Sequence, residues 1–277
     1  MKVIDTHVHF WDTNLLNYEW LKGTSLYRPF LPEDYKQAVG DVDIEGVVFV
    51  EVDRAPDQGL AEAEWVNSLD APVKGIVAFA PLERGNEARP ALEALARIPK
   101  VKAIRRLIQS EGAGFATQPR FVEGVRLLPE YGMRFDICIK YHQLSDTVAL
   151  VEQCPNVEFI LDHIAKPDIA NGEIEQWRTG ITRLAQFENV SCKLSGLVTE
   201  ADHANWKPAD LQPYVEHVLE VFGTDRLMFG SDFPVCTWAC TFSRWFETLE
   251  QFLAPLSDKE KQAIYHDNAV RYYGLVD

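Results

Sequence analysis

Cysteine is scarce in this chain and has no pattern. The 277 residues include five cysteines, an odd number, and no two of them form a C-x-x-C pair. Structural zinc sites and the disulfide frameworks of small secreted proteins both depend on regularly spaced cysteines. We therefore expect reduced and mostly buried thiols, with neither kind of cysteine site.

The chain also has few basic residues relative to acidic ones, and it lacks long apolar runs. Lysine and arginine number 27 against 42 aspartates and glutamates, so the net charge is -15, which repels nucleic acid and anionic membranes. No apolar run is long enough to cross a bilayer, and residues 1–5 do not lead into the apolar core of a secretion signal. The sequence thus predicts a cytoplasmic protein, a monomer or homodimer, that acts on a small molecule and binds neither nucleic acid nor membrane.

Glycine-rich phosphate loops are missing as well. No G-x-G-x-x-G or P-loop motif follows the first apolar run, which argues against an open, doubly wound nucleotide-binding sheet. The chain has instead short β-rich runs that alternate with segments of helical periodicity, at a repeat of roughly 30 residues. This pattern predicts a (β/α)8 TIM barrel, with the open doubly wound sheet as the alternative. The eight runs are Val3–His7, Gly46–Val52, Lys74–Ala80, Lys102–Ile108, Met133–Ile139, Val157–His163, Val190–Ser195 and Arg226–Ser231.

The domain organisation follows from the same repeat. No linker rich in proline, glycine or serine divides the chain, so residues 1–277 are expected to form a single barrel domain. Residues from about 10–32 are rich in aromatic side chains and lack helical periodicity, which predicts a long first loop over the barrel mouth. Ser257–Glu260 is a capping box that opens a final helix, over about residues 257–273, expected on the exterior of the barrel.

Ionisable side chains lie at the ends of three predicted strands. His7 and His9 lie two residues apart in a strand, so both imidazoles point to the same side. His163 ends the sixth run and Asp232 follows the eighth. Because active sites of TIM barrels form at the carboxyl ends of the strands, we expect these side chains to converge and to hold a divalent cation or activate a water molecule. Each histidine alone also fits a structural role, and only their joint placement favours catalysis.

Other charged and aromatic side chains near the expected mouth are weaker candidates. Only one of Arg105 and Arg106 can face the barrel interior, where it would bind a carbonyl or carboxylate group or form a structural ion pair. Lys193 fits a substrate contact and a buried ion pair equally well. Trp11 and Trp20 could stack on a sugar ring or pack within the loop. No G-x-S-x-G motif is present, so the usual serine hydrolase scaffold is excluded.

Five stretches of the chain carry a resemblance to a known family. Over essentially its whole length the chain resembles the amidohydrolase superfamily, and within it the sugar-lactonase branch of L-fuconolactonase-like and L-rhamnonolactonase-like proteins. The five stretches are Ile4–Asp12, Leu161–Pro167, Cys192–Leu197, Phe229–Cys236 and Asn268–Ala269.

The resemblance implies which residues are functional. The catalytic residues carried over from the superfamily are His7, His9, His163 and Asp232. Arg105, rather than its neighbour, matches the position of the family's substrate-binding arginine. Together with Trp11, Lys193 and Trp20, which are candidates from their own chemistry, Arg105 and His142 make up the expected substrate contacts.

The resemblance also bears on metal content. His142 is the nearest candidate for the fifth-strand histidine of the superfamily, either as a metal ligand or as a substrate contact. The lysine that bridges two metals in binuclear relatives has no counterpart on the fourth run. We therefore expect either one divalent metal, such as zinc, held by His7, His9 and Asp232, or catalysis without metal.

The implied activity is attack of water on a small sugar lactone, such as an aldono-lactone of L-fucose or L-rhamnose, to give the aldonic acid. In that reaction Asp232 would be the general base, while His7, His9 and Arg105 would stabilise the oxyanion. His163 would orient the water or pass a proton to the leaving alkoxide. A metal-dependent decarboxylase is the alternative enzyme, and a barrel that binds a sugar acid without turnover is the third hypothesis.

Overall fold

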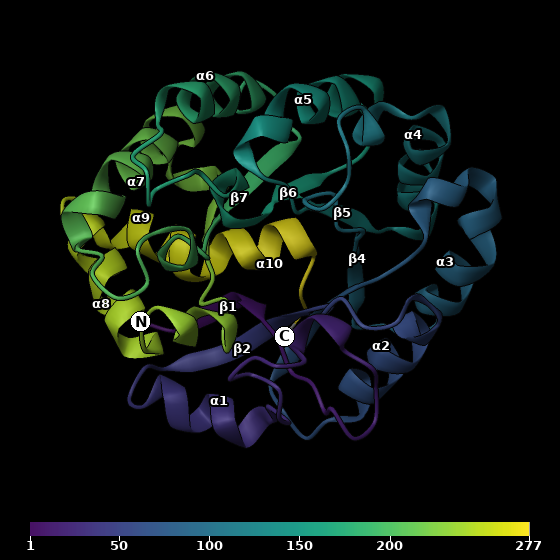
Figure 1. Cartoon of the computed structure of the whole chain (residues 1–277), viewed down its shortest axis with the longest axis horizontal. Coiled ribbons are helices and arrows are strands. Elements are labelled where there is room, and N and C mark those ends of the chain that lie inside the picture. Colours follow the sequence, from purple (N-terminus) through teal and green to yellow (C-terminus); the bar gives the residue numbers. More distant parts are fainter. Residues whose placement is uncertain (277) are drawn as a thin grey trace.

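The computed structural model describes residues 1–276 and consists of eight parallel strands arranged around one axis in the order of the sequence (Figure 1). Sequential order and parallel pairing are those of the predicted (β/α)8 TIM barrel, so the alternative of an open doubly wound sheet is wrong. The strands are β1 (Val3–Val8), β2 (Ile44–Val50), β3 (Val73–Ala78), β4 (Val101–Arg105), β5 (Arg134–Ile137), β6 (Phe159–Leu161), β7 (Val190–Leu194) and β8 (Leu227–Phe229).

Helices surround the strands and cover their outer faces, except for the last two along the chain (Figure 1). They are α1 (Pro32–Val39), α2 (Gly59–Ser68), α3 (Arg89–Ala96), α4 (Pro119–Arg126), α5 (Leu144–Gln153), α6 (Glu175–Leu184), α7 (Pro208–Phe222), α8 (Phe242–Phe252), α9 (Asp258–Gln262) and α10 (Asn268–Tyr273). Proline occupies the first turn of α1, α3, α4 and α7, where its missing N–H costs nothing. Gly223 ends α7 with a positive φ of 68°.

The barrel closes at the seam between β8 and β1. The segment after β8 crosses to β1 there, because the backbone N–H of Asp232 donates to the carbonyl of His7 at 2.9 Å. The N–H of His9 donates in turn to the carbonyl of Phe233 at 2.8 Å. These two bonds place Asp232 directly against the strand that carries both histidines.

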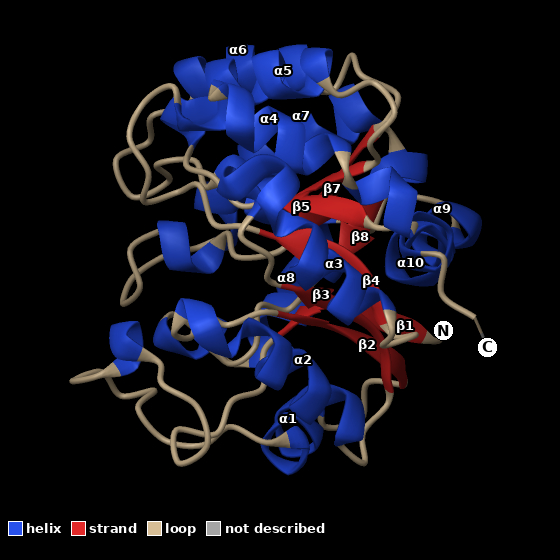
Figure 2. Ribbon diagram, turned by 90° about the vertical axis from the view of Figure 1, so that its right-hand side faces the viewer, coloured by secondary structure: helices blue, strands red, loops and turns tan. Residues whose placement is uncertain are grey.

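Different segments of the chain cover the two ends of the barrel. Figure 2 shows the long loops on one side of the strands, and both termini with α9 and α10 on the other. The first loop joins β1 to α1 and is held by an antiparallel bridge between Trp11 and Phe30. The loops at the carboxyl ends of the strands therefore form the mouth.

The final helix differs from the prediction. The segment consists of α9, a π-helical turn over Ala263–Asp267, and α10, and it packs against the amino-terminal end of the barrel rather than its exterior. Its apolar side chains Ala269, Tyr273 and Leu275 form one buried cluster with inward-facing strand residues. The strand residues of that cluster are Ile4, Val48, Val50, Val77, Ala103, Ile160 and Met228.

All five cysteines are free thiols, four of them buried and Cys240 partly exposed, as predicted. Within residues 1–276, no helix has the length and apolar character needed to cross a bilayer.

Candidate active site

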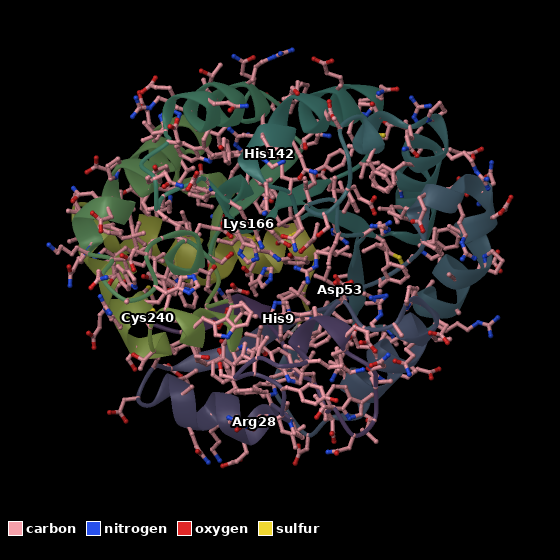
Figure 3. The ribbon with its side chains drawn as sticks, in the orientation of Figure 1. His9, Arg28, Asp53, His142, Lys166 and Cys240 are labelled. Carbon is pink, nitrogen blue, oxygen red and sulfur yellow. The ribbon has the colours of Figure 1, made fainter. Side chains whose placement is uncertain are left out.

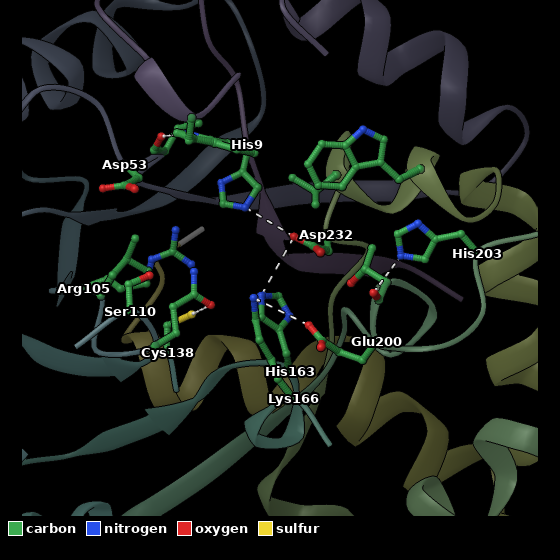
Figure 4. Close-up of a pocket in the computed structure, with 17 residues that line it drawn as sticks. His9, Asp53, Arg105, Ser110, Cys138, His163, Lys166, Glu200, His203 and Asp232 are labelled. Atoms are coloured by element: carbon green, nitrogen blue, oxygen red, sulfur yellow. Dashed lines mark hydrogen bonds and ion pairs between the residues drawn. The ribbon is translucent and has the colours of Figure 1, made fainter. Parts of the chain in front are cut away.

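Three imidazoles face one carboxylate oxygen at the mouth of the barrel, and Figure 4 shows two of them, His9 and His163, beside Asp232. Oδ1 of Asp232 lies 3.4 Å from Nε2 of His9, 3.8 Å from Nε2 of His7 and 4.0 Å from Nε2 of His163. All four side chains are almost fully buried. The structure therefore brings together the four residues that the sequence placed at strand ends.

The backbone directs these side chains toward one another. His7 lies within β1 and His9 just beyond it, so the strand period aims both rings at the mouth. His163 and Asp232 lie beyond the ends of β6 and β8, where both adopt left-handed φ values of 53° and 59°. The sixth and eighth strands end earlier than predicted, and these turns, not strand geometry, aim the last two side chains.

A hydrogen bond on the far side of the His9 ring determines which of its nitrogens faces Asp232 with a lone pair. Nδ1 of His9 lies 2.7 Å from the carbonyl of Val50, which can only accept, so Nδ1 carries the proton. Nε2 of His7 lies 3.4 Å from Nη1 of Arg105, which can only donate. Nδ1 of His7 lies 3.3 Å from Nζ of Lys193, which can only donate, and 3.3 Å from Oδ1 of Asp162, so both nitrogens of this ring face a cationic donor.

The electrostatics of the cluster keep the carboxylate charged and a ring neutral. Burial opposes ionisation of Asp232, but the imidazoles of His163, His9 and His7 outweigh it and hold the pKa of this carboxyl well below its usual range. Burial lowers the pKa of His163 to about 4, although Asp232 counteracts the shift. At neutral pH the site thus contains an ionised carboxylate next to an uncharged imidazole.

Arg105 supplies the positive charge beside this cluster. It lies at the end of β4, and its Nε donates to Oε1 of Glu51 at 2.8 Å while Nη1 donates to Oδ2 of Asp162 at 3.2 Å. Burial opposes its charge, but Glu51 and Asp162 raise the pKa of the guanidinium. Arg105 also lines the mouth, so it is both held by carboxylates and open to a ligand.

A buried ionic network forms the floor below the histidines. Nζ of Lys193 lies 2.6 Å from Oδ2 of Asp136, 2.9 Å from Oδ1 of Asp162 and 3.3 Å from Nδ1 of His7, and its side chain has no exposed surface. The expected substrate contact of Lys193 is therefore not found, because the ammonium is used inside the barrel. Tyr273 of α10 completes the network with a hydrogen bond of 2.7 Å to Asp136.

The cavity above the cluster, here called the mouth cavity, has a volume of about 360 Å³, which suits a small ligand. Trp20 lines it and donates its indole N–H to the carbonyl of Val52 at 2.8 Å. Trp11 has no exposed surface and donates to the carbonyl of Arg28 at 2.7 Å. Contrary to the predicted sugar contact, Trp11 therefore packs the first loop.

His142 also differs from its predicted place. It follows β5 but is exposed, and it lines a separate surface depression beside α5 and α6. Figure 3 shows it on the side of α5 and α6, away from His9. The chain turns outward after β5, so His142 is neither a metal ligand nor a contact in the mouth cavity.

Four acidic or basic residues of the mouth cavity were not singled out from the sequence. Asp53 follows β2, Lys166 follows β6, and Glu200 and His203 follow β7. Only Lys166 had a usable signal, because it lies three residues after His163 in the stretch that carries the family resemblance. The others lie in loops without a periodic pattern.

Comparison with known proteins identifies the family. The family model described as amidohydrolase matches residues 4–275. The chain belongs to the amidohydrolase family. The resemblance noted from the sequence is thus confirmed.

Relatives of this amidohydrolase include named lactonases. It is 30% identical to L-fucono-1,5-lactonase of Burkholderia ambifaria, over 98% of this chain and 95% of that protein. It is 24% identical to L-rhamnono-gamma-lactonase of Scheffersomyces stipitis, over 99% of both chains. A crystal structure of an amidohydrolase from Burkholderia multivorans with bound zinc covers 100% of both chains, with a TM-score of 0.90 and 28% identity.

The donor set of this amidohydrolase fits one metal ion. Ligand atoms of His7, His9 and Asp232 all lie within 4.8 Å of one another. Two of these atoms are imidazole nitrogens and the third is a carboxylate oxygen, and this combination suits zinc. Arg105 opposes the fit, because its cationic Nη1 lies 3.4 Å from Nε2 of His7.

Proposed function

We propose that this amidohydrolase hydrolyses a small sugar lactone to the aldonic acid. The observation that carries the proposal is the convergence of His7, His9 and His163 on Oδ1 of Asp232, beside the guanidinium of Arg105. This arrangement offers a base for water and a donor for a carbonyl oxygen within one cavity. The names of the lactonase relatives support the choice of a sugar lactone.

The residues of the site have distinct roles in this reaction. Asp232, kept ionised by its imidazole neighbours, accepts a proton from the attacking water. Arg105 donates to the oxygen that becomes negative as the carbonyl is attacked, and the rings of His7 and His9 line the same position. His163, neutral at neutral pH, orients the water or relays the proton that Asp232 accepted from it to the ring oxygen as that oxygen leaves.

A divalent metal fits the same residues. Zinc bound by His7, His9 and Asp232 would polarise the carbonyl and make bound water more acidic. The general base and the donor described above are groups of the protein itself.

The test is a lactonase assay with a matched pair of variants. Purified protein is offered L-fucono-1,5-lactone and L-rhamnono-1,4-lactone, and acid release is followed with a pH indicator, before and after chelation of metal. Asp232→Asn should lower kcat/KM by at least about a hundredfold while the circular dichroism spectrum is unchanged.

Asp70→Asn is the control, because Asp70 is exposed in the loop between α2 and β3. Its kcat/KM should equal that of the wild type. Undiminished activity in Asp232→Asn would overturn the assigned base. Release of CO2 from an aromatic or enoic acid, with no lactone opened, would replace the proposal by the decarboxylase.

A further inference from the structure

A left-handed turn directs two side chains into the mouth cavity. His163, Ile164, Ala165 and Lys166 all have φ between 46° and 65°, a conformation that is unfavourable for L-residues. The N–H of Lys166 closes the turn on the carbonyl of His163 at 2.8 Å. Side chains three residues apart on such a turn share a face, so Lys166 lines the same cavity as His163.

Lys166 is paired with Glu200, but too loosely for a direct hydrogen bond. Nζ of Lys166 lies 3.9 Å from Oε1 of Glu200, beyond the usual limit near 3.2 Å. Both side chains are largely buried, with 19% and 25% of their surface exposed. The two loops are fixed to each other, since the N–H of Ala170 donates to the carbonyl of Glu200 at 3.0 Å.

This spacing suits one hydroxyl group. A hydroxyl oxygen between the two groups can accept a hydrogen bond from the ammonium and donate one to the carboxylate. The pair is neutral as a whole, and Arg105 is already balanced by Glu51 and Asp162. The cavity therefore has no surplus of positive charge for a dicarboxylate, and it favours an uncharged polyhydroxylated ligand.

The pair lies to one side of the reacting centre. Figure 4 shows Arg105 and Glu200 on opposite sides of Asp232 and His163. A lactone whose carbonyl oxygen lies at Arg105 would extend its ring substituents across the cavity toward Glu200. The ring hydroxyls and the carbonyl would then be bound by separate groups.

We propose that Lys166 and Glu200 bind a hydroxyl group of the lactone and give the enzyme its preference for hydroxylated over aliphatic lactones. This inference rests on the proposed function and goes further by assigning specificity to two residues. A site built to bind a hydroxyl penalises a ligand that lacks it, because the polar groups are left unpaired.

The test compares two lactones with the same ring. For each protein, kcat/KM is measured for L-fucono-1,5-lactone and for δ-valerolactone, which has no hydroxyl groups, and the ratio of the two values is taken. Lys166→Met keeps the length of the side chain but removes the donor, and its ratio should be about tenfold to a hundredfold below that of the wild type. Glu200→Gln should lower the ratio less, because its amide oxygen still accepts.

Glu173→Gln is the matched control, since Glu173 is exposed on the loop before α6. Its ratio should equal that of the wild type. A purely structural ion pair would change the stability of Lys166→Met without changing the ratio. A ratio within twofold of the wild type in Lys166→Met, or a wild-type ratio near one, would overturn the inference and leave the proposed lactonase in place.

A binding measurement separates this inference from the proposed function. The 1,5-lactam of L-fuconic acid keeps the ring hydroxyls and resists hydrolysis, so calorimetry can follow its binding even if no lactone is turned over. Binding by the wild type that weakens at least tenfold in Lys166→Met supports the hydroxyl subsite. Absent binding, or equal binding by both proteins, overturns it.

Discussion

At the scale of single residues, the site is governed by charges placed close to His7. The guanidinium of Arg105 and a metal ion would both lie near Nε2 of this ring, 3.4 Å from Nη1. Two positive charges about 4 Å apart repel by several kcal/mol near a protein surface. Arg105 therefore favours the oxyanion of the reaction and opposes a cation at the same place.

This repulsion predicts how zinc binding responds to a substitution. Arg105→Met should bind zinc at least about tenfold more tightly than the wild type, while lactone turnover falls. Titration of chelated protein with zinc, read by calorimetry, measures the change. His9→Asn in the Arg105→Met background should abolish the gain, and equal zinc affinity in Arg105→Met and the wild type would contradict the predicted competition.

A second residue-scale property concerns Asp5, which supports the seam from behind. Its Oδ1 accepts from the N–H of Ser231 at 2.8 Å and its Oδ2 from the hydroxyl of Tyr35 at 2.9 Å. Burial raises the pKa of this carboxyl from 3.8 to about 6, although the donors lower it. The folded chain thus holds the proton more tightly than the unfolded chain does.

The stability of the folded chain falls as the carboxyl of Asp5 ionises. The contribution of protonated Asp5 to stability is complete below pH 3.8 and is lost as the pH rises through about 6. Asp5→Asn never carries the charge, so its free energy of unfolding relative to the wild type should rise by about 2 kcal/mol from about pH 4.5 to about pH 7.5. Urea unfolding at both pH values measures this, and a pH-independent difference would show that Asp5 titrates normally.

At the scale of elements, strained turns gather at the strand ends around the mouth cavity. Within residues 1–276, positive φ at non-glycine positions occurs only at Asp53, at the turn from His163 to Lys166, and at Asp232. Asp53, Asp232 and both ends of the turn line the mouth cavity. Such strain persists where the surrounding structure enforces it, and here it aims polar side chains inward.

The loop after β7 must approach this turn closely. Gly196 has a φ of +65°, and a Cβ there would lie 2.4 Å from Nδ1 of His163. Gly172 has a φ of +68° with open space around it. Both positions therefore favour glycine because of their left-handed backbone. Only at Gly196 does close packing also leave no room for a Cβ atom.

Substitution of each glycine by alanine separates the effect of backbone strain from the effect of displacing the His163 ring. Both Gly196→Ala and Gly172→Ala should lose about 1 kcal/mol of stability through the left-handed backbone. Gly196→Ala should in addition lower kcat/KM by at least about a hundredfold, because the ring of His163 must move. Lactone kinetics and urea unfolding measure the two effects, and equal kinetics for the two variants would show that the position of His163 is not critical.

At the scale of the whole molecule, one buried network joins the two ends of the barrel. It starts at His7 in the mouth, passes through Asp162, Lys193 and Asp136, and ends at Tyr273 of α10. Helix α10, which closes the amino-terminal end of the barrel, thus also binds Asp136, a carboxylate in the floor of the site. Stability of the barrel and geometry of the site are coupled through this network.

A pair of adjacent tyrosines tests that coupling. Tyr273→Phe removes the hydroxyl bound to buried Asp136 and should lower the free energy of unfolding by about 1–3 kcal/mol. Tyr272→Phe removes a hydroxyl that donates to Asp225 at the surface and should cost less than about 0.5 kcal/mol. Urea unfolding compares them, and equal losses would mean that Asp136 does not depend on Tyr273.

The sequence by itself determined the barrel and the four residues of the central cluster. Alternating strand and helix patterns are local properties, and so is the position of His7, His9, His163 and Asp232 at or just past strand ends. In a parallel barrel all such ends meet at one mouth, so the local pattern was enough to predict their convergence.

Only the tertiary structure decided which other side chains share the mouth cavity. Trp20 lines it while Trp11 is buried, Lys193 is part of the buried network that forms the floor, and His142 is exposed beside α5 and α6, although all four were candidate substrate contacts. Lys166 enters the cavity through a left-handed turn that no periodicity reveals. The physical reason is that loop paths and positive-φ turns depend on contacts between segments distant in the sequence, whereas strand and helix periods depend on neighbouring residues.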